Sequence, residues 1–137
     1  MLNSGIEVND EVVATFNDVK LGRKFRYALF KISDDFKHVV LEKKADASAT
    51  YEDFTGELPA DACRYGVVDY EYKSADGRAT SKILFVVWAP DSAPIKSKML
   101  ITSTKDAVKK KLVGIGIEVQ ATDFSELQPE SFKDRLN

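Results

Sequence analysis

The chain has 137 residues, of which 44% are hydrophobic and 31% are charged, and its formal net charge is −2. This length and balance predict one soluble globular domain with a single core, and they exclude a disordered chain. The slightly acidic total argues against a dedicated nucleic-acid-binding protein, which is usually strongly basic.

The first half of the chain predicts a helix, a pair of strands and a second helix. Asn9 is a suitable N-cap for the first helix because acidic residues follow it, and Gly22 ends the apolar period. Thr50 and Asp53 have the spacing of a capping box at the start of the second helix. The other predicted ranges are strands over 24–32 and 37–42, a turn over 33–35 and the second helix over 50–58.

The second half predicts another strand pair, a long helix, a last strand and a terminal helical segment. The strand over 82–88 is apolar on both faces, as expected where helices cover both sides of a sheet. The other ranges are a strand over 63–72, a hairpin turn over 74–77, a helix over 94–114, a strand over 117–121 and a helical segment over 122–136 that Pro129 interrupts. This order predicts an α+β fold over residues 1–137, with a mixed five-stranded sheet between helices.

The predicted long helix carries the positive charge of an otherwise acidic chain. Residues 94–112 hold six lysines and one aspartate. At a helical period of about 3.6 residues, Ile101, Val108 and Leu112 fall on one line, which is the natural core face. Lys98 flanks that line and is expected to project outward. The opposite stripe mixes apolar and polar side chains, namely Ile95, Lys96, Met99, Ser103, Asp106 and Lys110.

Three interpretations of this mixed stripe stay open on the residues alone. It is typical of an amphipathic helix that docks into a groove on another protein, where Met99 suits an adaptable contact. A solvated lysine-rich helix, with its few apolar side chains beneath a neighbouring loop, explains the pattern equally well. Basic clusters also bind anionic lipid surfaces, which is the third interpretation.

The sequence offers no constellation for catalysis. His38 is the only histidine and lies within a predicted strand, so we expect a structural or surface role. Cys63 begins an apolar strand and is expected to be a buried, inert thiol. There is no metal-ligand spacing, no phosphate-binding glycine loop and no carboxylate pair in a setting for acid–base chemistry. We therefore expect a protein that is not an enzyme and uses no metal or cofactor.

The same patterns predict where the protein resides. No apolar run reaches the ~18 residues of a membrane span, because the longest covers only 83–89. The first residues lack the basic and apolar regions of a signal peptide, so we expect the protein to stay where it is made. A single cysteine excludes an internal disulfide and fits a reducing compartment.

The stretch over 88–112, WAPDSAPIKSKMLITSTKDAVKKKL, resembles the signature of the actin-depolymerising factor/cofilin family. Further matches run along the whole chain, at 4–6, 21–22, 51–54, 58–59, 63–65, 69–71 and 120–123. The resemblance is to a single-domain member and excludes two-domain relatives such as twinfilin by length. It implies the family fold, which is a central mixed sheet flanked by helices on both faces.

The resemblance also implies a function and a binding surface. Members of the family bind actin monomers and filaments, prefer the ADP form, sever filaments and promote depolymerisation. The long helix would enter the groove between two actin subdomains, with Lys96 and Lys98 as the main charged contacts and Ile95 and Met99 as the apolar ones. Residues that would extend this surface are Ser4, Lys105, Asp106, Lys109 and Lys110.

Filament binding in the family uses a second surface. Lys82, Asp134 and Arg135 match it, and Arg78 lies nearby. Thr80 stands where a basic residue is common, and the sequence given stops at residue 137 without the basic tail of many members. Monomer binding is therefore the firmer expectation, and strong severing the weaker one.

The resemblance also implies how the protein is regulated. Ser4 matches the family's phosphorylation serine, where a phosphate adds about −1.5 to −2 charge and would repel an acidic partner. The implied partners are actin, phosphoinositide lipids competing for the same lysines, and a kinase and phosphatase acting on Ser4, with no nucleic acid.

We expect a monomer in the cytoplasm and the actin cytoskeleton, in the cortex or in patches. Nuclear entry stays open, although the lysine-rich import insert of vertebrate members has no counterpart here. The alternatives to a filament-disassembling protein are a phosphoinositide-binding module for which actin is incidental, and an actin side-binding adaptor that does not sever.

Overall fold

The computed structural model describes residues 5–21 and 24–136. Its strands are β1 (Glu7–Val8), β2 (Phe25–Ile32), β3 (His38–Asp46), β4 (Arg64–Lys73), β5 (Ala79–Trp88) and β6 (Ile117–Ala121). Its α-helices are α1 (Asp10–Lys20), α2 (Tyr51–Glu57) and α3 (Ile95–Lys111). Three short 3-10 helices follow, η1 (Phe124–Leu127), η2 (Pro129–Ser131) and η3 (Lys133–Arg135).

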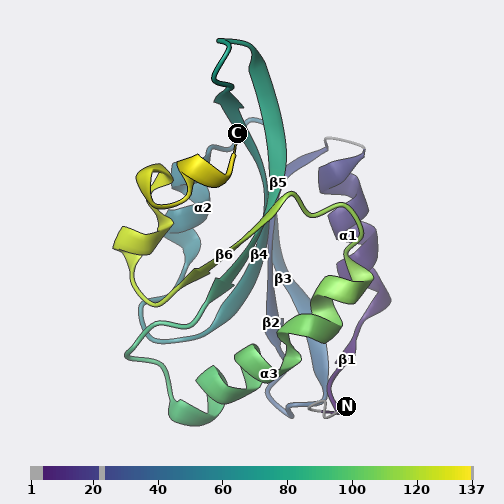
Figure 1. The fold of residues 1–137 in the computed structure, drawn as a ribbon. Helices are drawn as coiled ribbons and strands as arrows, with labels where there is room; N and C mark the ends of the chain where they lie inside the picture. Colours follow the sequence, from purple (N-terminus) through teal and green to yellow (C-terminus); the bar gives the residue numbers. More distant parts are fainter. Residues whose placement is uncertain (1–4, 22–23, 137) are drawn as a thin grey trace.

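A mixed sheet in the order β1-β3-β2-β4-β5-β6 forms the centre of the molecule (Figure 1). The outer pairs β1–β3 and β5–β6 are parallel, and the pairs between them are antiparallel. The predicted α+β class is confirmed. The predicted count of five strands is wrong, because the described residues form six.

Apolar side chains leave the sheet on both faces and build two cores. Along β5, Phe85 and Val87 pack with α1 and α3, whereas Leu84, Val86 and Trp88 pack with α2 and the C-terminal 3-10 helices. Successive residues of a strand point to opposite faces, so an uninterrupted apolar run is what a doubly covered strand needs. This confirms the expectation of helices on both faces.

The local start signals of the helices differ in strength. Thr50 forms the predicted capping box, because its hydroxyl accepts from the Asp53 amide at 3.0 Å and the Asp53 carboxylate accepts from the Thr50 amide at 2.9 Å. Asn9 occupies the N-cap of α1, but its side chain makes no capping hydrogen bond. Helix α1 ends at Lys20, and Gly22 lies outside the described residues.

Several other boundaries differ from the prediction, since β5 begins at Ala79 rather than at 82 and α3 ends at Lys111 rather than at 114. Strand β3 continues to Asp46 because it pairs with the start of β2, where Phe25 lies opposite Asp46. The terminal segment forms three short 3-10 helices rather than one interrupted helix, and Pro129 begins the second of them. Within the described ranges no helix is long and apolar enough to cross a membrane.

Candidate binding surface on helix α3

Helix α3 is fixed to the sheet along the predicted line. Ile101, Val108 and Leu112 are buried, which confirms the predicted core face. Thr104 is buried on the same side. The hydroxyl of Tyr65 on β4 donates a hydrogen bond to the carbonyl of Ile101, and burial raises the pKa of this phenol. The opposite side of the helix is therefore held toward solvent.

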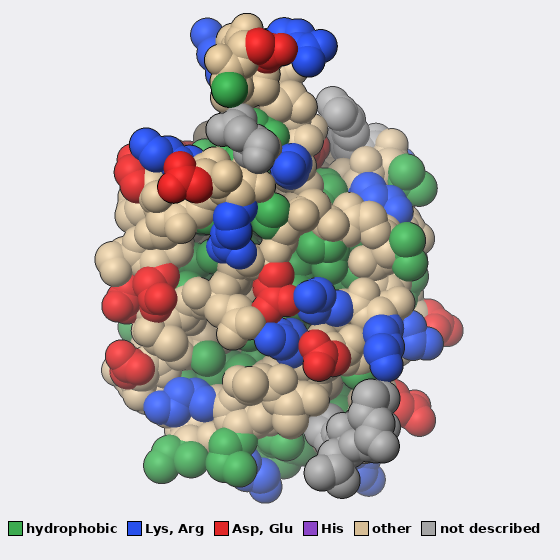
Figure 2. All heavy atoms as spheres, in the orientation of Figure 1, with side chains coloured by type: hydrophobic (Ala, Val, Ile, Leu, Met, Phe, Trp, Pro, Cys, Tyr) green, Lys and Arg blue, Asp and Glu red, His purple; other side chains and the backbone are tan. Residues whose placement is uncertain are grey.

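The first turns of α3 present an apolar surface to solvent. Ile95 is 74% exposed and Met99 is 66% exposed, although both side chains are large and hydrophobic. Together with Lys98, Thr102 and Ser103 they line a shallow, open depression. Figure 2 shows hydrophobic side chains beside basic ones at the lower edge of the molecule, where α3 begins in Figure 1.

The two lysines of these first turns meet no carboxylate among the described residues. The ammonium of Lys96 lies 4.2 Å from the ring centroid of Phe36, in a cation–π contact. The ammonium of Lys98 donates to the carbonyl of Asp91 at 3.2 Å. Both positive charges therefore stand beside exposed Ile95 and Met99 without an ion pair to any residue in the described ranges.

The second half of α3 is arranged differently. Lys105 and Lys109, one helical turn apart, both pair with Glu118 of β6, at 3.2 Å and 2.7 Å. Only 20% of the Lys105 side chain and 40% of the Lys109 side chain are exposed. The Glu118 carboxylate also accepts from the Gln120 amide at 2.6 Å. These two lysines are therefore tied to the sheet.

The electrostatics of Glu118 follow from these contacts. Its partial burial acts to raise the carboxyl pKa, but hydrogen bonds from Lys109, Gln120 and Lys105 outweigh burial and lower it. The hydrogen bond between Lys109 and Glu118 also raises the pKa of the Lys109 ammonium. Glu118 is not among the predicted site residues, and its signal in the sequence is an acidic residue on a strand that faces lysines spaced by four on a helix.

The remaining predicted residues of this surface point outward or lie outside the described ranges. Asp106 and Lys110 are exposed, on the side of the helix that carries Ser103. Ser4 lies outside the described residues. The structure therefore groups Ile95, Lys96, Lys98 and Met99 at one end of α3.

The predicted filament surface gathers around the β4–β5 hairpin, which projects from the body of the molecule (Figure 1). Arg78 lies at its tip and pairs with Asp76 at 2.9 Å. A depression beside the turn is lined by Tyr72, Ser74, Arg78, Ala79, Thr80 and Leu136, so the hairpin and the C-terminal segment share one surface. Arg135 donates to the carbonyl of Glu118 at 2.7 Å, and Asp134 is exposed beside it.

Lys82 lies further along β5, on the face of the sheet that carries the C-terminal 3-10 helices. Leu84 and Val86 pack into that core, and residues two apart in a strand share a face. The structure thus places Lys82 on the same side of the sheet as the C-terminal segment that holds Asp134 and Arg135.

The two residues considered for chemistry lie at the starts of strands, since His38 begins β3 and Cys63 directly precedes β4. Cys63 is buried, and burial raises the pKa of its thiol. The ring Nδ1 of His38 is buried without a hydrogen-bond partner among the described residues. In the same ranges no group of three or more His, Cys, Asp or Glu residues is placed to hold a metal ion.

The family model described as "Cofilin/tropomyosin-type actin-binding protein" matches residues 5–137. The chain belongs to the actin-depolymerising factor/cofilin family. It is 52% identical to actophorin from Acanthamoeba castellanii over 132 residues, which cover 96% of this chain and 95% of that protein. It is 45% identical to Cofilin-1A from Dictyostelium discoideum over 134 residues, which cover 98% of this chain and 97% of that protein.

A solved structure agrees with this assignment. The cofilin reported from Streptomyces griseoflavus has a TM-score of 0.87 and 40% sequence identity to this chain, and the match covers 96% of each. The resemblance carried by residues 88–112 is therefore confirmed as family membership.

Proposed function

We propose that this chain binds actin monomers and filaments with preference for the ADP form, severs filaments and promotes their depolymerisation. The observation that carries the proposal is the start of α3, where exposed Ile95 and Met99 stand beside two lysines that no described carboxylate neutralises. Family membership supports actin as the partner of this surface.

The chemistry of this surface suits an acidic groove. Burial of each large apolar side chain is worth about 1.5–3 kcal/mol, and Ile95 and Met99 have most of their surface still to bury. Lys96 and Lys98 would steer the encounter and fix its orientation, because charges at the rim of an interface act mainly on association. Asp106 and Lys110 would extend the same contact along α3.

Filament binding would add the second surface, formed by the β4–β5 hairpin and the C-terminal segment. Arg78, Lys82, Asp134 and Arg135 are its charged residues. Two observations support this second surface. Lys82 lies on the side of the sheet that carries the C-terminal segment, and one depression joins the hairpin to Leu136.

The regulation and setting that we propose follow from the charge of the docking surface. Phosphoinositides at a membrane surface would compete with actin for Lys96 and Lys98. A kinase and a phosphatase acting on Ser4 would switch binding, since a phosphate repels an acidic partner. The protein would act as a monomer in the cytoplasm and the actin cytoskeleton, without enzymatic activity.

Co-sedimentation with actin filaments tests the proposal. The double change Lys96→Ala and Lys98→Ala is expected to remove most of the binding at low salt, and survival of binding would show that the assigned surface is wrong. Filament length measured by microscopy then tests severing. Absence of shortening at any dose would leave a side-binding adaptor.

A further inference from the structure

The turn between β2 and β3 is a tightly hydrogen-bonded unit. The Ser33 hydroxyl donates to the Asp35 carboxylate at 2.6 Å and accepts from the His38 amide at 3.1 Å. The Asp35 carboxylate also accepts from the Lys37 amide at 3.1 Å, and the Ser33 amide donates to the His38 carbonyl at 2.7 Å. These bonds leave the backbone of the turn with little freedom.

The unit holds Phe36 in a conformation that phenylalanine rarely adopts. Its φ is 61°, and it is the only described non-glycine residue with a positive φ. A bulky side chain in the left-handed region is an outlier that persists only where its surroundings fix it. The residue is nevertheless 41% exposed, so its burial does not account for the strained backbone.

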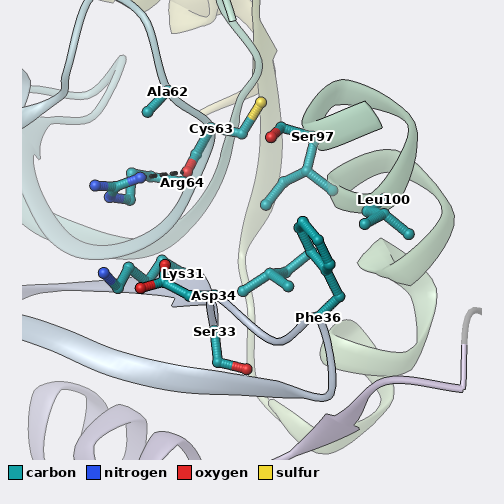
Figure 3. A pocket seen from close by; sticks show the side chains of 11 residues that line it. Lys31, Ser33, Asp34, Phe36, Ala62, Cys63, Arg64, Ser97 and Leu100 are labelled. Carbon is teal, nitrogen blue, oxygen red and sulfur yellow. Dashed lines mark hydrogen bonds between the residues drawn. The ribbon is translucent and has the colours of Figure 1, made fainter. Parts of the chain in front are cut away.

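The conformation directs the ring toward α3. Figure 3 shows the Phe36 ring pointing at the helix beside Leu100, across a cleft from Cys63. The cleft has a volume of about 340 Å³, and Ser97 and Leu100 form its helical wall. On this helix the ammonium of Lys96 stands 4.2 Å from the ring centroid.

We propose that Phe36 is a positioning residue for Lys96, an inference that rests on the proposed actin-binding role of the α3 surface. The negative face of the ring attracts the ammonium and restricts a side chain that otherwise samples many rotamers. A lysine ammonium has three donors, so a ring against one side leaves the others for a carboxylate of the partner. Lys96 then loses less conformational freedom on binding.

Two variants separate this role from simple filling of the cleft. Phe36→Tyr keeps an aromatic face, whereas Phe36→Leu keeps an apolar side chain and removes the ring. We expect Phe36→Leu to weaken binding of ADP-actin monomers about two- to five-fold, the size of an exposed cation–π contact. Phe36→Tyr is expected to bind as the unchanged protein does, and thermal unfolding of both variants checks that each is folded.

Two further readouts make the test specific. In NMR spectra, the ε-methylene protons of Lys96 should show an upfield ring-current shift that Phe36→Tyr retains and Phe36→Leu loses. In a double-mutant cycle, Phe36→Leu should have no effect on actin affinity once Lys96→Ala is present.

The outcomes distinguish the inference from the function on which it rests. If Lys96→Ala weakens actin binding but Phe36→Leu does not, or if Phe36→Leu acts equally with and without Lys96, the positioning role is overturned and the binding surface stands. If Lys96→Ala leaves actin binding unchanged, the role of this lysine in the binding surface is overturned, and the positioning role with it. Absence of the ring-current shift in the unchanged protein would overturn the contact itself.

Discussion

The two halves of α3 carry the same residue type in opposite settings. Lys96 and Lys98, in the first turns, have an aromatic ring and a backbone carbonyl as their neighbours. Lys105 and Lys109, two turns later, share one carboxylate. The difference comes from the elements below the helix, because Glu118 of β6 underlies only the second half. The number of lysines on a helix therefore does not measure the charge that it offers to a partner.

This contrast divides the basic helix into two functions. The first half combines uncompensated charge with exposed apolar area, which is what a docking surface needs. In the second half, the ion pairs hold the helix to the edge of the sheet. We therefore expect substitutions of lysine to affect binding in the first half and stability in the second.

The largest expected effect concerns the charges of the first half. The double change Lys96→Ala and Lys98→Ala should raise the dissociation constant for actin monomers roughly thirty-fold, or about 2 kcal/mol, because two charged contacts of about 1 kcal/mol each are lost together. The matched control is Lys105→Ala with Lys109→Ala, which removes the same charge from the same helix. Equal losses of affinity in the two double variants would break the distinction between the halves.

The second-largest effect is expected from the exposed apolar side chains in the first half of α3. Met99→Ala is expected to weaken actin binding by about 1.5 kcal/mol, roughly ten-fold, because the side chain buries area only in the complex. Its exposure in the free protein predicts an unchanged unfolding free energy. Binding to vesicles that contain phosphoinositides should not change, since it depends on the lysines. A parallel loss of vesicle binding would instead favour a lipid-binding surface.

The second half is tested by stability. Glu118→Gln and Lys109→Ala should each lower the unfolding free energy measured with urea, and their effects should not add. The coupling expected from a double-mutant cycle is about 0.5–1 kcal/mol, a modest value because Lys109 is partly exposed and solvent screens the pair. Fully additive effects would mean that this ion pair contributes no measurable stability.

The smallest effect concerns pH. The pKa of Glu118 is lowered in the folded protein from an ordinary value of 4.5. A lowered carboxyl pKa gives stability that is present above 4.5 and is lost as the pH falls through the folded value. The difference in unfolding free energy between the unchanged protein and Glu118→Gln should therefore shrink below pH 4.5. A difference that stays constant into stronger acid would contradict this assignment.

The parts of the fold that depend on local periodicity could be predicted from the sequence. The capping box predicts the start of α2, and the helical spacing of apolar residues predicts the two faces of α3. Both signals lie within a few residues of one another in the sequence. Strand β1 was missed because two residues are too short to show alternation. The 3-10 character of the C-terminal segment was missed because its turns are set by packing on the sheet.

The missed parts of the site depend on tertiary register. Glu118 meets Lys105 and Lys109 only because β6 pairs in parallel with β5 beneath α3. The polar sequence around Asp34 indicated a turn, but not that Phe36 would adopt a positive φ and face Lys96. The contacts of Glu118 span nine and thirteen residues across the end of α3, and the Phe36–Lys96 contact spans sixty, so the periodicity within a single element does not report them.

The central claim is that the first half of α3 binds actin and the second half holds the helix to the sheet. Its most direct test is the reactivity of the α3 lysines toward an acetylating reagent, measured by mass spectrometry with and without ADP-actin monomers. In the free protein, Lys96 and Lys98 should react quickly, whereas the ion pairs with Glu118 should slow Lys105 and Lys109. Actin should protect Lys96 and Lys98 and leave the slow rates of the other two nearly unchanged. Protection confined to Lys105 and Lys109, with Lys96 and Lys98 still reactive in the complex, would contradict the account.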